Sequence, residues 1–494
     1  MLHKPSNKVT FTDENISLLF GFEDAESEPI HRLREYYLKN ETYSRVSADL
    51  PLRILVGHKG VGKSALFKMS IAEEKEKGNL PILIKPDDIA ELGKSDENFL
   101  LKIRQWKYGL TKIIGAKVFS EFGLDDDETL TNKLSKFGIK LISFISDSIT
   151  EVKDKIDLEP TRKLLVENFL KSKKIIIYLD DLDRGWEGKK DDIIRISTLL
   201  NSVRDMANEN PGLSFKVSLR SDVYFLVRTS DESTDKIEGS VVWYSWSNNE
   251  ILSMLIKRVL TYFDEKFDVS SLRNASQHNL SLYLDDIMVR RFEGKGKWEN
   301  KPTYKILMSM IRKRPRDMVK LCTLAARDAY KEKSNIITTQ NFINIFEEYS
   351  QGRMQDTINE YRSELPNIEK LLLGMKPSRK SKKDGSGYVF SAEELQQKIN
   401  NIMQQVRFTF SNGKLATAKD LSHFLYKINF LTARKEMADG EIHRKYYDEN
   451  KYLISASVNF GYDFEIHPAY RWVLKPDSIN DIFHELSLTA DDVM

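Results

Sequence analysis

The sequence predicts an α/β fold in which a parallel sheet carries helices on both faces. Two observations indicate this fold most directly. A phosphate-loop motif lies between an apolar run and a helix-like stretch in residues 52–69, and a second apolar run at 175–179 ends in acidic residues. A third is that further apolar runs alternate with helix-like stretches, which is typical of parallel sheets. Carboxylates that follow a central strand of such a sheet face the ligand crevice.

The composition is that of a folded chain with more than one domain. Its 494 residues are too many for one core, so we expect two or three domains. Hydrophobic residues make up 40% and aromatic residues 10%, which argues against global disorder. The 76 basic and 74 acidic residues leave a net charge of +2. A nucleic-acid, membrane or acidic partner would therefore need a local charged surface.

Several classes of site are excluded by the sequence. Cys322 is the single cysteine, so an intrachain disulfide and a cysteine-based zinc site are ruled out, and the eight histidines show no metal spacing. The N-terminal residues have no apolar signal core, and no run of about 18 apolar residues occurs. We therefore expect no membrane partner and a cytoplasmic location.

The phosphate-loop motif G-x-x-x-x-G-K-[ST] is complete and stands in the expected strand–loop–helix context. Glycines let backbone N–H groups point at phosphate oxygens, and the helix N-terminus adds positive charge. Lys63 is expected to reach the β- and γ-phosphates, and the Ser64 hydroxyl to bind Mg²⁺. His58 and Lys59 occupy variable positions and are expected to face solvent. The predicted nucleotide-binding residues are Gly57, His58, Lys59, Gly60, Val61, Gly62, Lys63, Ser64 and Ala65.

The second apolar run, Ile175–Leu179, shows no alternation, as expected for a strand buried on both faces. It ends in Asp180 and Asp181. We expect Asp180 to hold Mg²⁺, directly or through water, and Asp181 to orient or deprotonate the attacking water. An acidic turn without a ligand is the alternative, but together with the phosphate loop the pattern predicts a nucleoside triphosphate and Mg²⁺ as ligands.

The ending Asp-Asp-Leu-Asp-Arg, about 120 residues after the phosphate loop, resembles the KAP and STAND-like branch of the AAA+ ATPases. Residues 213–228 resemble the next core strand of that family, 241–259 a strand and first lid helix, and 311–322 a lid motif with a Pro-Arg step. Residues 18–28 and 464–474 resemble bacterial P-loop ATPases, many of which sit in mobile or anti-phage defence loci. The likeness covers roughly residues 15–330 and is weaker in the C-terminal third.

This resemblance implies an ATPase that uses ATP and Mg²⁺. Many AAA+ hydrolases carry Glu where this chain has Asp181, which is one methylene shorter, so slow and regulated hydrolysis is expected. Arg316, in the Pro-Arg step, is the expected catalytic arginine of the lid. Candidates for a sensor, or for an arginine finger from a neighbouring copy, are Arg184, Arg220 and Arg228. Each of these is an ion-paired surface arginine in the alternative interpretation.

We expect the chain to divide into successive segments. They are an N-terminal segment that packs on the nucleotide site (1–50), a P-loop ATPase core (51–240) with a helical insertion at about 95–170, a helical lid (241–350), a helix and basic linker (351–390), and a C-terminal winged-helix-like α+β domain (391–494).

The C-terminal domain is predicted from a capping box at Ser391 and Glu394, an amphipathic helix in 417–434, and hairpin signals after it. Winged helices bind DNA in some proteins and serve as packing modules in others. A basic face on this domain is expected from Arg434, Lys435, Arg444 and Lys445.

Two functions are open at this point. The first is a molecular switch that binds and slowly hydrolyses ATP, assembles with copies of itself and controls a separate effector protein in prokaryotic anti-phage defence. The alternative is an AAA+ ATPase stimulated by DNA or RNA, such as a loader or translocase module.

Overall fold

The computed structural model describes residues 9–94, 98–124, 141–152, 160–230, 232–377, 387–438, 440–450, 453, 461–474 and 488–492. Its contacts divide the chain into two compact units. We call Pro29–Arg34 with Lys39–Tyr244 the core unit, and Met1–Glu28 with Glu35–Leu38 and Ser245–Met494 the flanking unit. The division after Tyr244 lies beside the boundary predicted at 240, whereas residues 1–50 are shared between the two units.

The core unit is built on a five-stranded sheet with the order β2-β3-β4-β1-β5, in which every pairing is parallel. The apolar runs at 80–84 and 175–179 are buried almost throughout, which suits a sheet covered by helices, whereas residues 213–220 alternate apolar with polar side chains. Its strands are β1 (Leu52–Gly57), β2 (Leu80–Ile84), β3 (Ile175–Leu179), β4 (Leu213–Arg220) and β5 (Val241–Trp243).

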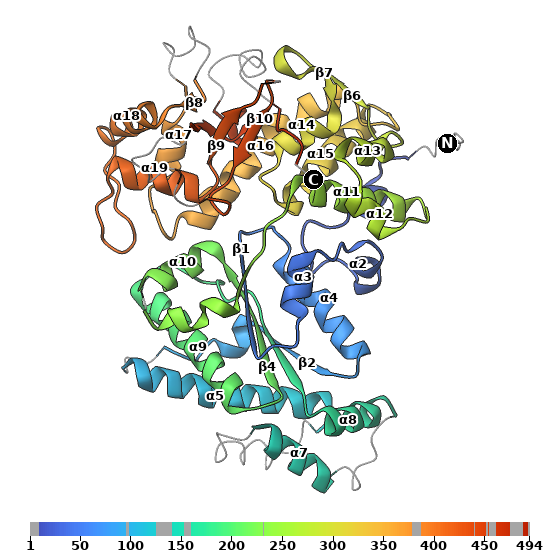
Figure 1. Ribbon diagram of the computed structural model, residues 1–494, viewed down its shortest axis with the longest axis vertical. Helices are drawn as coiled ribbons and strands as arrows, with labels where there is room; N and C mark the ends of the chain where they lie inside the picture. Colours follow the sequence, from blue (N-terminus) through green and yellow to red (C-terminus); the bar gives the residue numbers. More distant parts are fainter. Residues whose placement is uncertain are drawn as a thin grey trace. The chain divides into compact units, whose positions relative to one another are not determined.

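Helices cover both faces of this sheet, and the predicted α/β class is confirmed (Figure 1). On one face, α4 packs through Phe67 against Tyr178, with ring centroids 5.1 Å apart. On the other, α5 packs on α9, and the buried Trp106 indole donates 3.1 Å to Thr198 Oγ1. The helices of this unit are α2 (Ile30–Tyr36, whose last two residues belong to the flanking unit), α3 (Glu41–Ser47), α4 (Lys63–Glu76), α5 (Phe99–Glu121), α7 (Leu141–Val152), α8 (Pro160–Ser172), α9 (Lys190–Glu209) and α10 (Ser221–Ser230), with the 3₁₀ turns η1 (Pro86–Ile89) and η2 (Glu232–Ser240).

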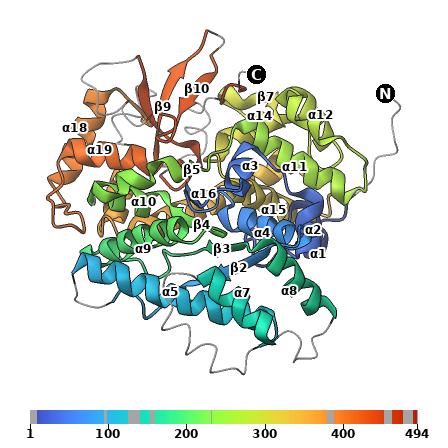
Figure 2. The ribbon, with the colours of Figure 1, turned by 60° about the horizontal axis from the view of Figure 1, so that its bottom comes forward.

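The stretch predicted as a helical insertion supplies α5, α7 and α8. Figure 2 shows α5 and α7 beside each other along one face of the sheet. Their apolar residues join the main core cluster, which includes Ile114 of α5, Ile145 of α7 and Phe169 of α8. The insertion is therefore part of the core that holds the sheet.

The first part of the flanking unit is mainly helical, and its role as a lid stays a prediction. Its elements are α1 (Asp13–Phe20), α11 (Asn248–Tyr262), α12 (Val269–Asn274), α13 (Gln277–Ser281), η3 (Leu282–Leu284), β6 (Arg291–Glu293), η4 (Gly296–Trp298), β7 (Glu299–Pro302), α14 (Thr303–Met310), α15 (Pro315–Lys331), α16 (Thr339–Tyr361) and α17 (Ile368–Gly374). Helix α1 packs on α11 and α15.

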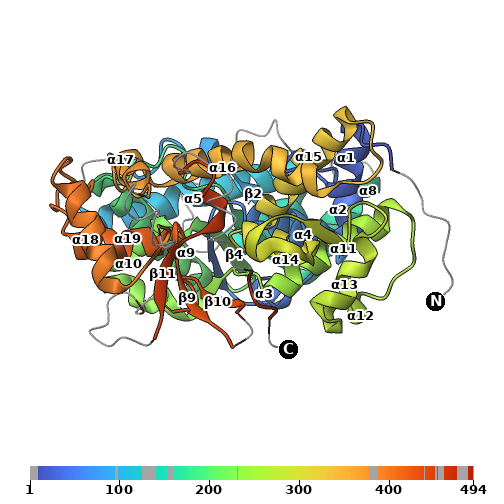
Figure 3. The same ribbon diagram turned by 90° about the horizontal axis from the view of Figure 1, so that it is seen from above.

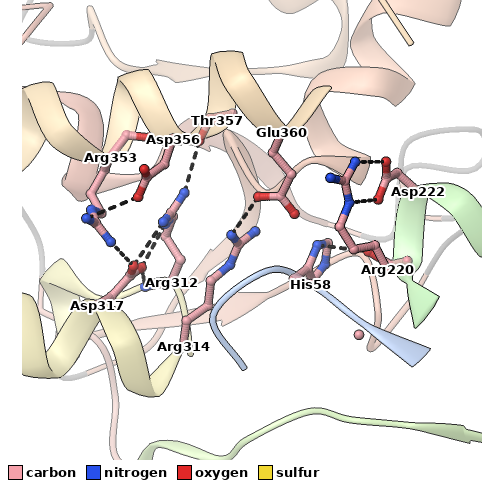
Figure 4. A network of polar contacts seen from close by, with 12 residues as sticks. His58, Arg220, Asp222, Arg312, Arg314, Asp317, Arg353, Asp356, Thr357 and Glu360 are labelled. Carbon is pink, nitrogen blue, oxygen red and sulfur yellow. Dashed lines mark hydrogen bonds and ion pairs between the residues drawn. The ribbon is translucent and has the colours of Figure 1, made fainter. Parts of the chain in front are cut away.

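Buried ion pairs join α15 to α16 within this unit. Arg312 donates to Asp317 through Nε at 2.7 Å, Arg353 donates to the same carboxylate at 2.6 Å, and Arg314 pairs with Glu360 at 3.0 Å (Figure 4). Burial alone would raise the pKa of Asp317, but the two guanidinium groups hold it far below its ordinary value. The carboxylate therefore stays charged, and its removal would take from the buried Arg312 its ion pair with Asp317, while Arg353 would keep Asp356 at 3.1 Å.

The C-terminal part combines helices with an antiparallel sheet of order β10-β9-β11-β8 (Figure 3). The predicted capping box at Ser391 and Glu394 is present at the start of its first helix. The α+β character is thus confirmed, while the winged-helix assignment stays a prediction. Of the basic linker at 376–387, residues 378–386 lie outside the described part. The elements are β8 (Val389–Phe390), α18 (Ala392–Met403), α19 (Ala418–Lys427), β9 (Leu431–Glu436), β10 (Ile442–Lys445), β11 (Asp463–Ile466) and η6 (Pro468–Tyr470).

The expected basic face on this domain is wrong for its two arginines. Arg434 and Arg444 are cross-strand partners whose side chains are buried. Arg444 pairs with the fully buried Glu465 at 2.5 Å, and Arg471 reaches the other oxygen of that carboxylate at 2.7 Å. Of the two lysines, Lys435 is exposed and Lys445 is half-buried, because strand alternation puts the arginines on the inner face.

A search of the described residues for a helix long and apolar enough to cross a membrane finds none.

Candidate nucleotide-binding site

The phosphate loop connects β1 to α4, and its backbone favours glycine at Gly57, Gly60 and Gly62, of which Gly60 has φ of 85°. Gly62, which caps α4, has φ of 97°, a region that side chains with a Cβ rarely occupy. At Gly57 an added Cβ would lie 3.0 Å from Val61 Cγ2 and 3.1 Å from the carbonyl oxygen of Tyr244. The loop is therefore tight, and it ends at the N-terminus of a 14-residue helix, where backbone N–H groups favour anions.

Lys63 is the first residue of α4 and its side chain turns back onto the loop. Its Nζ donates to the carbonyl of Gly57 at 2.9 Å and to that of His58 at 3.2 Å. Ser64 follows at the second position of the helix. The ammonium and the hydroxyl thus come from the same first turn, as the motif requires.

The acidic loop begins where β3 ends. It leaves the sheet at the carboxyl ends of the parallel strands, as the phosphate loop does, and we call this side of the sheet the carboxyl edge, or simply the edge. Since β4 lies between β1 and β3, these two strands are about 10 Å apart, or two strand spacings. Val217 of β4 is level with both Leu179 and Ile54, which fixes the relative height of the two strands. The structure therefore brings the predicted metal ligands, Ser64 and Asp180, to one edge.

Asp181 has an unusual backbone and an ionic partner. Its φ is 58°, in the left-handed region that aspartate tolerates better than most residues. Its carboxylate Oδ2 accepts from Arg184 Nη2 at 2.9 Å and Nε at 3.1 Å. Burial, followed by the negative charge of Asp183, raises the pKa of Asp181 above its ordinary 3.8. A raised pKa makes the carboxylate a stronger base.

The position of His58 corrects the expectation that it faces solvent. Its side chain is buried, with 4% of the residue exposed, and its Nδ1 lies 3.0 Å from Ser221 Oγ. Ser221 directly follows β4, and in the parallel register Gly57 pairs with Arg220. His58 and Ser221 are therefore successors of paired residues on neighbouring strands, which is why they meet. Lys59 is exposed, as predicted.

Arg220 is the predicted sensor candidate that lies deepest in this edge. Its guanidinium makes a two-pronged contact with Asp222, at 3.0 and 2.5 Å (Figure 4). A third hydrogen bond joins it to Asp183 at 3.0 Å. The arginine side chain is 13% exposed and that of Asp222 is 1% exposed. Arg220 thus ties the acidic loop to the end of β4.

The other predicted arginines have partners in this chain. Arg184 is paired with Asp181, as described above. Arg228 on α10 forms ion pairs with Asp235 and Glu238. Arg316 lies in the first turn of α15, in the flanking unit, where its Nε donates 3.0 Å to the carbonyl of Glu23. Their proposed roles as fingers or lid arginine stay predictions.

Two residues at this edge were not among the predicted ones. Tyr244, after β5, donates its N–H to the carbonyl of Val56 at 2.7 Å and packs directly beside Gly57. Ser221 holds His58. Both lie in segments with a family resemblance, 213–228 and 241–259, but only the strand order shows that they meet the phosphate loop.

The donor set fits a nucleoside triphosphate with Mg²⁺. Mg²⁺ prefers oxygen ligands and is usually held by one or two protein groups together with phosphates and water. The Ser64 hydroxyl and the Asp180 carboxylate are such groups, and Asp180 Oδ1 already accepts the N–H of Asp181 at 2.9 Å, which orients it. No group of three or more His, Cys, Asp or Glu side chains placed to hold a metal ion occurs among the described residues.

No known family model matches the chain. A protein of Escherichia coli (strain K12), named for the transposon gamma-delta and its mass of 80.3 kDa, is 21% identical over 489 residues. The match covers 88% of this chain, which spans only 65% of the length of that relative.

Solved structures with similarity to the chain include three ATP- or DNA-associated proteins. The Walker-type ATPase PABY2304 of Pyrococcus abyssi has a TM-score of 0.42 at 12% identity, covering 89% of this chain and 95% of that one. The Aeropyrum pernix ORC2 protein has 0.40 at 11%, covering 91% and 93%. The Aeropyrum pernix ORC1 protein in complex with DNA has 0.32 at 11%, covering 94% and 96%. TM-scores this low do not establish a shared fold. The description of this site as a nucleotide site therefore depends on the strand order and the loop geometry of this chain.

Proposed function

We propose that this chain binds ATP with Mg²⁺ and hydrolyses it slowly, as a P-loop ATPase of the KAP and STAND-like branch of AAA+. The observation that carries the proposal is the shared edge of the sheet. A tight glycine loop at a helix N-terminus and a loop with three aspartates lie there with only β4 between them. This arrangement supplies phosphate donors on one side and metal and water ligands on the other.

Each group has a role in this proposal. Lys63 and the loop N–H groups bind the β- and γ-phosphates, and Ser64 and Asp180 hold Mg²⁺. The ion, when bound, neutralises negative charge on the phosphates. Asp181 leaves its ion pair with Arg184 and accepts a proton from the attacking water. Because Arg184 is 59% exposed, that pair is weak and its release costs little.

The substitution Lys63→Ala tests ATP binding. A hydrogen bond to a charged group contributes about 1.5–3 kcal/mol, so the ATP affinity should fall by about 10-fold or more. The measurement is equilibrium titration with a fluorescent ATP analogue and Mg²⁺. The matched control is Lys75→Ala on the same helix, where the lysine is 53% exposed and makes only a 3.9 Å contact with Glu121. Equal affinity in the wild-type protein and Lys63→Ala would refute the proposal.

The biological role that we propose is a switch that assembles with copies of itself and controls a separate effector. The match to a protein named for a transposon is in keeping with the mobile or defence loci that the sequence resemblance implies. Gel filtration with light scattering, with and without a non-hydrolysable ATP analogue, measures the assembly. A larger particle with the analogue is expected, and an unchanged mass at all protein concentrations would count against the switch.

A second candidate is an ATPase stimulated by DNA or RNA. The observation that favours it is the β9–β10 hairpin, which follows α19 and carries the exposed Lys435 and His443. If the hairpin contacts a nucleic-acid backbone, DNA should raise the hydrolysis rate and binding should weaken steeply with salt. A hydrolysis rate that is the same with and without DNA and RNA would exclude this candidate.

A further inference from the structure

A buried histidine in the phosphate loop is the starting point. His58 stands between Gly57 and the exposed Lys59, yet it is 4% exposed and its ring meets Ser221, which is 1% exposed. Its backbone carbonyl accepts a hydrogen bond from the Lys63 ammonium at 3.2 Å. A ligand that draws Lys63 toward phosphates therefore removes a contact from His58 itself.

Ser221 follows Arg220 in the chain, and the side chain of that arginine is held by two carboxylates. Arg220 is held by Asp222 on one side and by Asp183 at 3.0 Å on the other. Asp183 lies two residues after Asp181 in the acidic loop. We call His58, Ser221, Arg220, Asp222 and Asp183 the edge network; it links the loops after β1, β3 and β4.

We propose that His58 is a positioning residue, which acts through Ser221 and Arg220 to set the place of the acidic loop that carries Asp181. This inference rests on the proposed ATPase function and deepens it. It states how nucleotide binding at the phosphate loop would change the position of the acidic loop, which orients the attacking water. Filling of the loop changes the contacts of Lys63 and His58, and the Ser221 contact passes that change to Arg220 and Asp183.

The competing explanation is that the imidazole only fills space under the loop. The two explanations differ in what they require of the Nδ1 atom. Packing needs a side chain of similar volume, so His58→Leu would satisfy it. Coupling needs a polar atom at the position of Nδ1, which His58→Asn retains because an Asn side-chain amide places a polar atom at the same distance from the backbone.

The experiment is a double-mutant cycle on hydrolysis, with His58→Leu, Ser221→Ala, the combined variant and His58→Asn. Steady-state kinetics gives kcat, and titration with a fluorescent ATP analogue gives the affinity. Each single substitution that breaks the contact should lower kcat by about 3- to 10-fold. The combined variant should be no worse than either single one, and His58→Asn should stay near wild type. His278→Leu, at an exposed histidine of α13, is the control for the same chemical change.

The outcomes separate this inference from the proposed function. If the wild-type protein binds ATP but the two single effects multiply, or His58→Asn is as slow as His58→Leu, then the coupling is refuted and the ATPase proposal stands. If the wild-type protein binds no ATP, the proposed function fails first. Should His58→Leu not fold, a slow Ser221→Ala with a fast His58→Asn would still support the coupling, and a wild-type rate for Ser221→Ala would overturn it.

Discussion

The surroundings of Asp181 change the backbone conformation and the pKa of this one residue. Its left-handed backbone turns the acidic loop, its neighbours Asp180 and Asp183 add negative charge, and Arg184 offsets part of that charge. Burial and the carboxylates together raise its pKa above 3.8, while Arg184 lowers it. The raised pKa thus makes this carboxylate a stronger base than an isolated aspartate.

The pH dependence of hydrolysis tests the proposed role of Asp181 as the base. A base works only when deprotonated, so the rate should fall as the pH drops through the raised pKa of Asp181. Removal of the arginine charge by Arg184→Ala should move that fall to higher pH. Asp181→Asn should lower kcat by about 10²- to 10⁴-fold and leave ATP affinity near wild type. If Asp181→Asn hydrolyses ATP at the wild-type rate across the pH range, another group is the base.

At the scale of elements, the junction of β1 and α4 depends on backbone conformation more than on side chains. The loop must reverse direction within a few residues and present N–H groups at the start of α4. Gly62 makes this turn with a φ that costs a residue with a Cβ about 1–2 kcal/mol. A substitution there affects the strand–helix junction as a whole.

Gly62→Ala should therefore destabilise the core unit by about 1–2 kcal/mol and weaken ATP binding. Chemical unfolding followed by circular dichroism measures the first effect, and ATP titration the second. Gly239→Ala is the matched control, because an added Cβ there meets no atom within 4 Å. Unchanged ATP affinity in Gly62→Ala would mean that the loop does not form the phosphate site.

At the scale of the whole molecule, the flanking unit contains buried charges that link its stability to pH. Burial alone would raise the pKa of Glu465, but Arg444 and Arg471 lower it from 4.5 to about 2. A carboxyl group with a depressed folded-state pKa contributes stability above its unfolded pKa, and that stability is lost as the pH falls through the folded value. The affected window is therefore from about pH 4.5 down to about pH 2.

Thermal unfolding of Glu465→Gln tests this linkage. The variant should be less stable at neutral pH by about 3–5 kcal/mol, because two buried arginines lose their charged partner. Its stability should also depend less on pH between about 4.5 and 2, although Asp317 still contributes there. Glu436→Gln, at a carboxylate that is 56% exposed, should unfold like the wild-type protein. A variant as acid-sensitive as the wild type would exclude Glu465 as the linked group.

The sequence alone determined the features that depend on local patterns. The phosphate loop, the strand that ends in Asp180, the helical insertion and the capping box at Ser391 follow from glycine spacing, apolar runs and helix-capping chemistry. These signals are local because they reflect backbone conformation and the burial of neighbouring side chains.

Only the tertiary structure decided which distant residues meet. The position of β4 between β1 and β3 brings His58 to Ser221 and Arg220 to Asp183, and strand alternation turns Arg434 and Arg444 inward toward Glu465. The local sequence around a charged or polar residue does not show whether that residue is exposed or buried, because the cost of burying it is offset by a partner far away in the sequence. Strand order and register supply that partner.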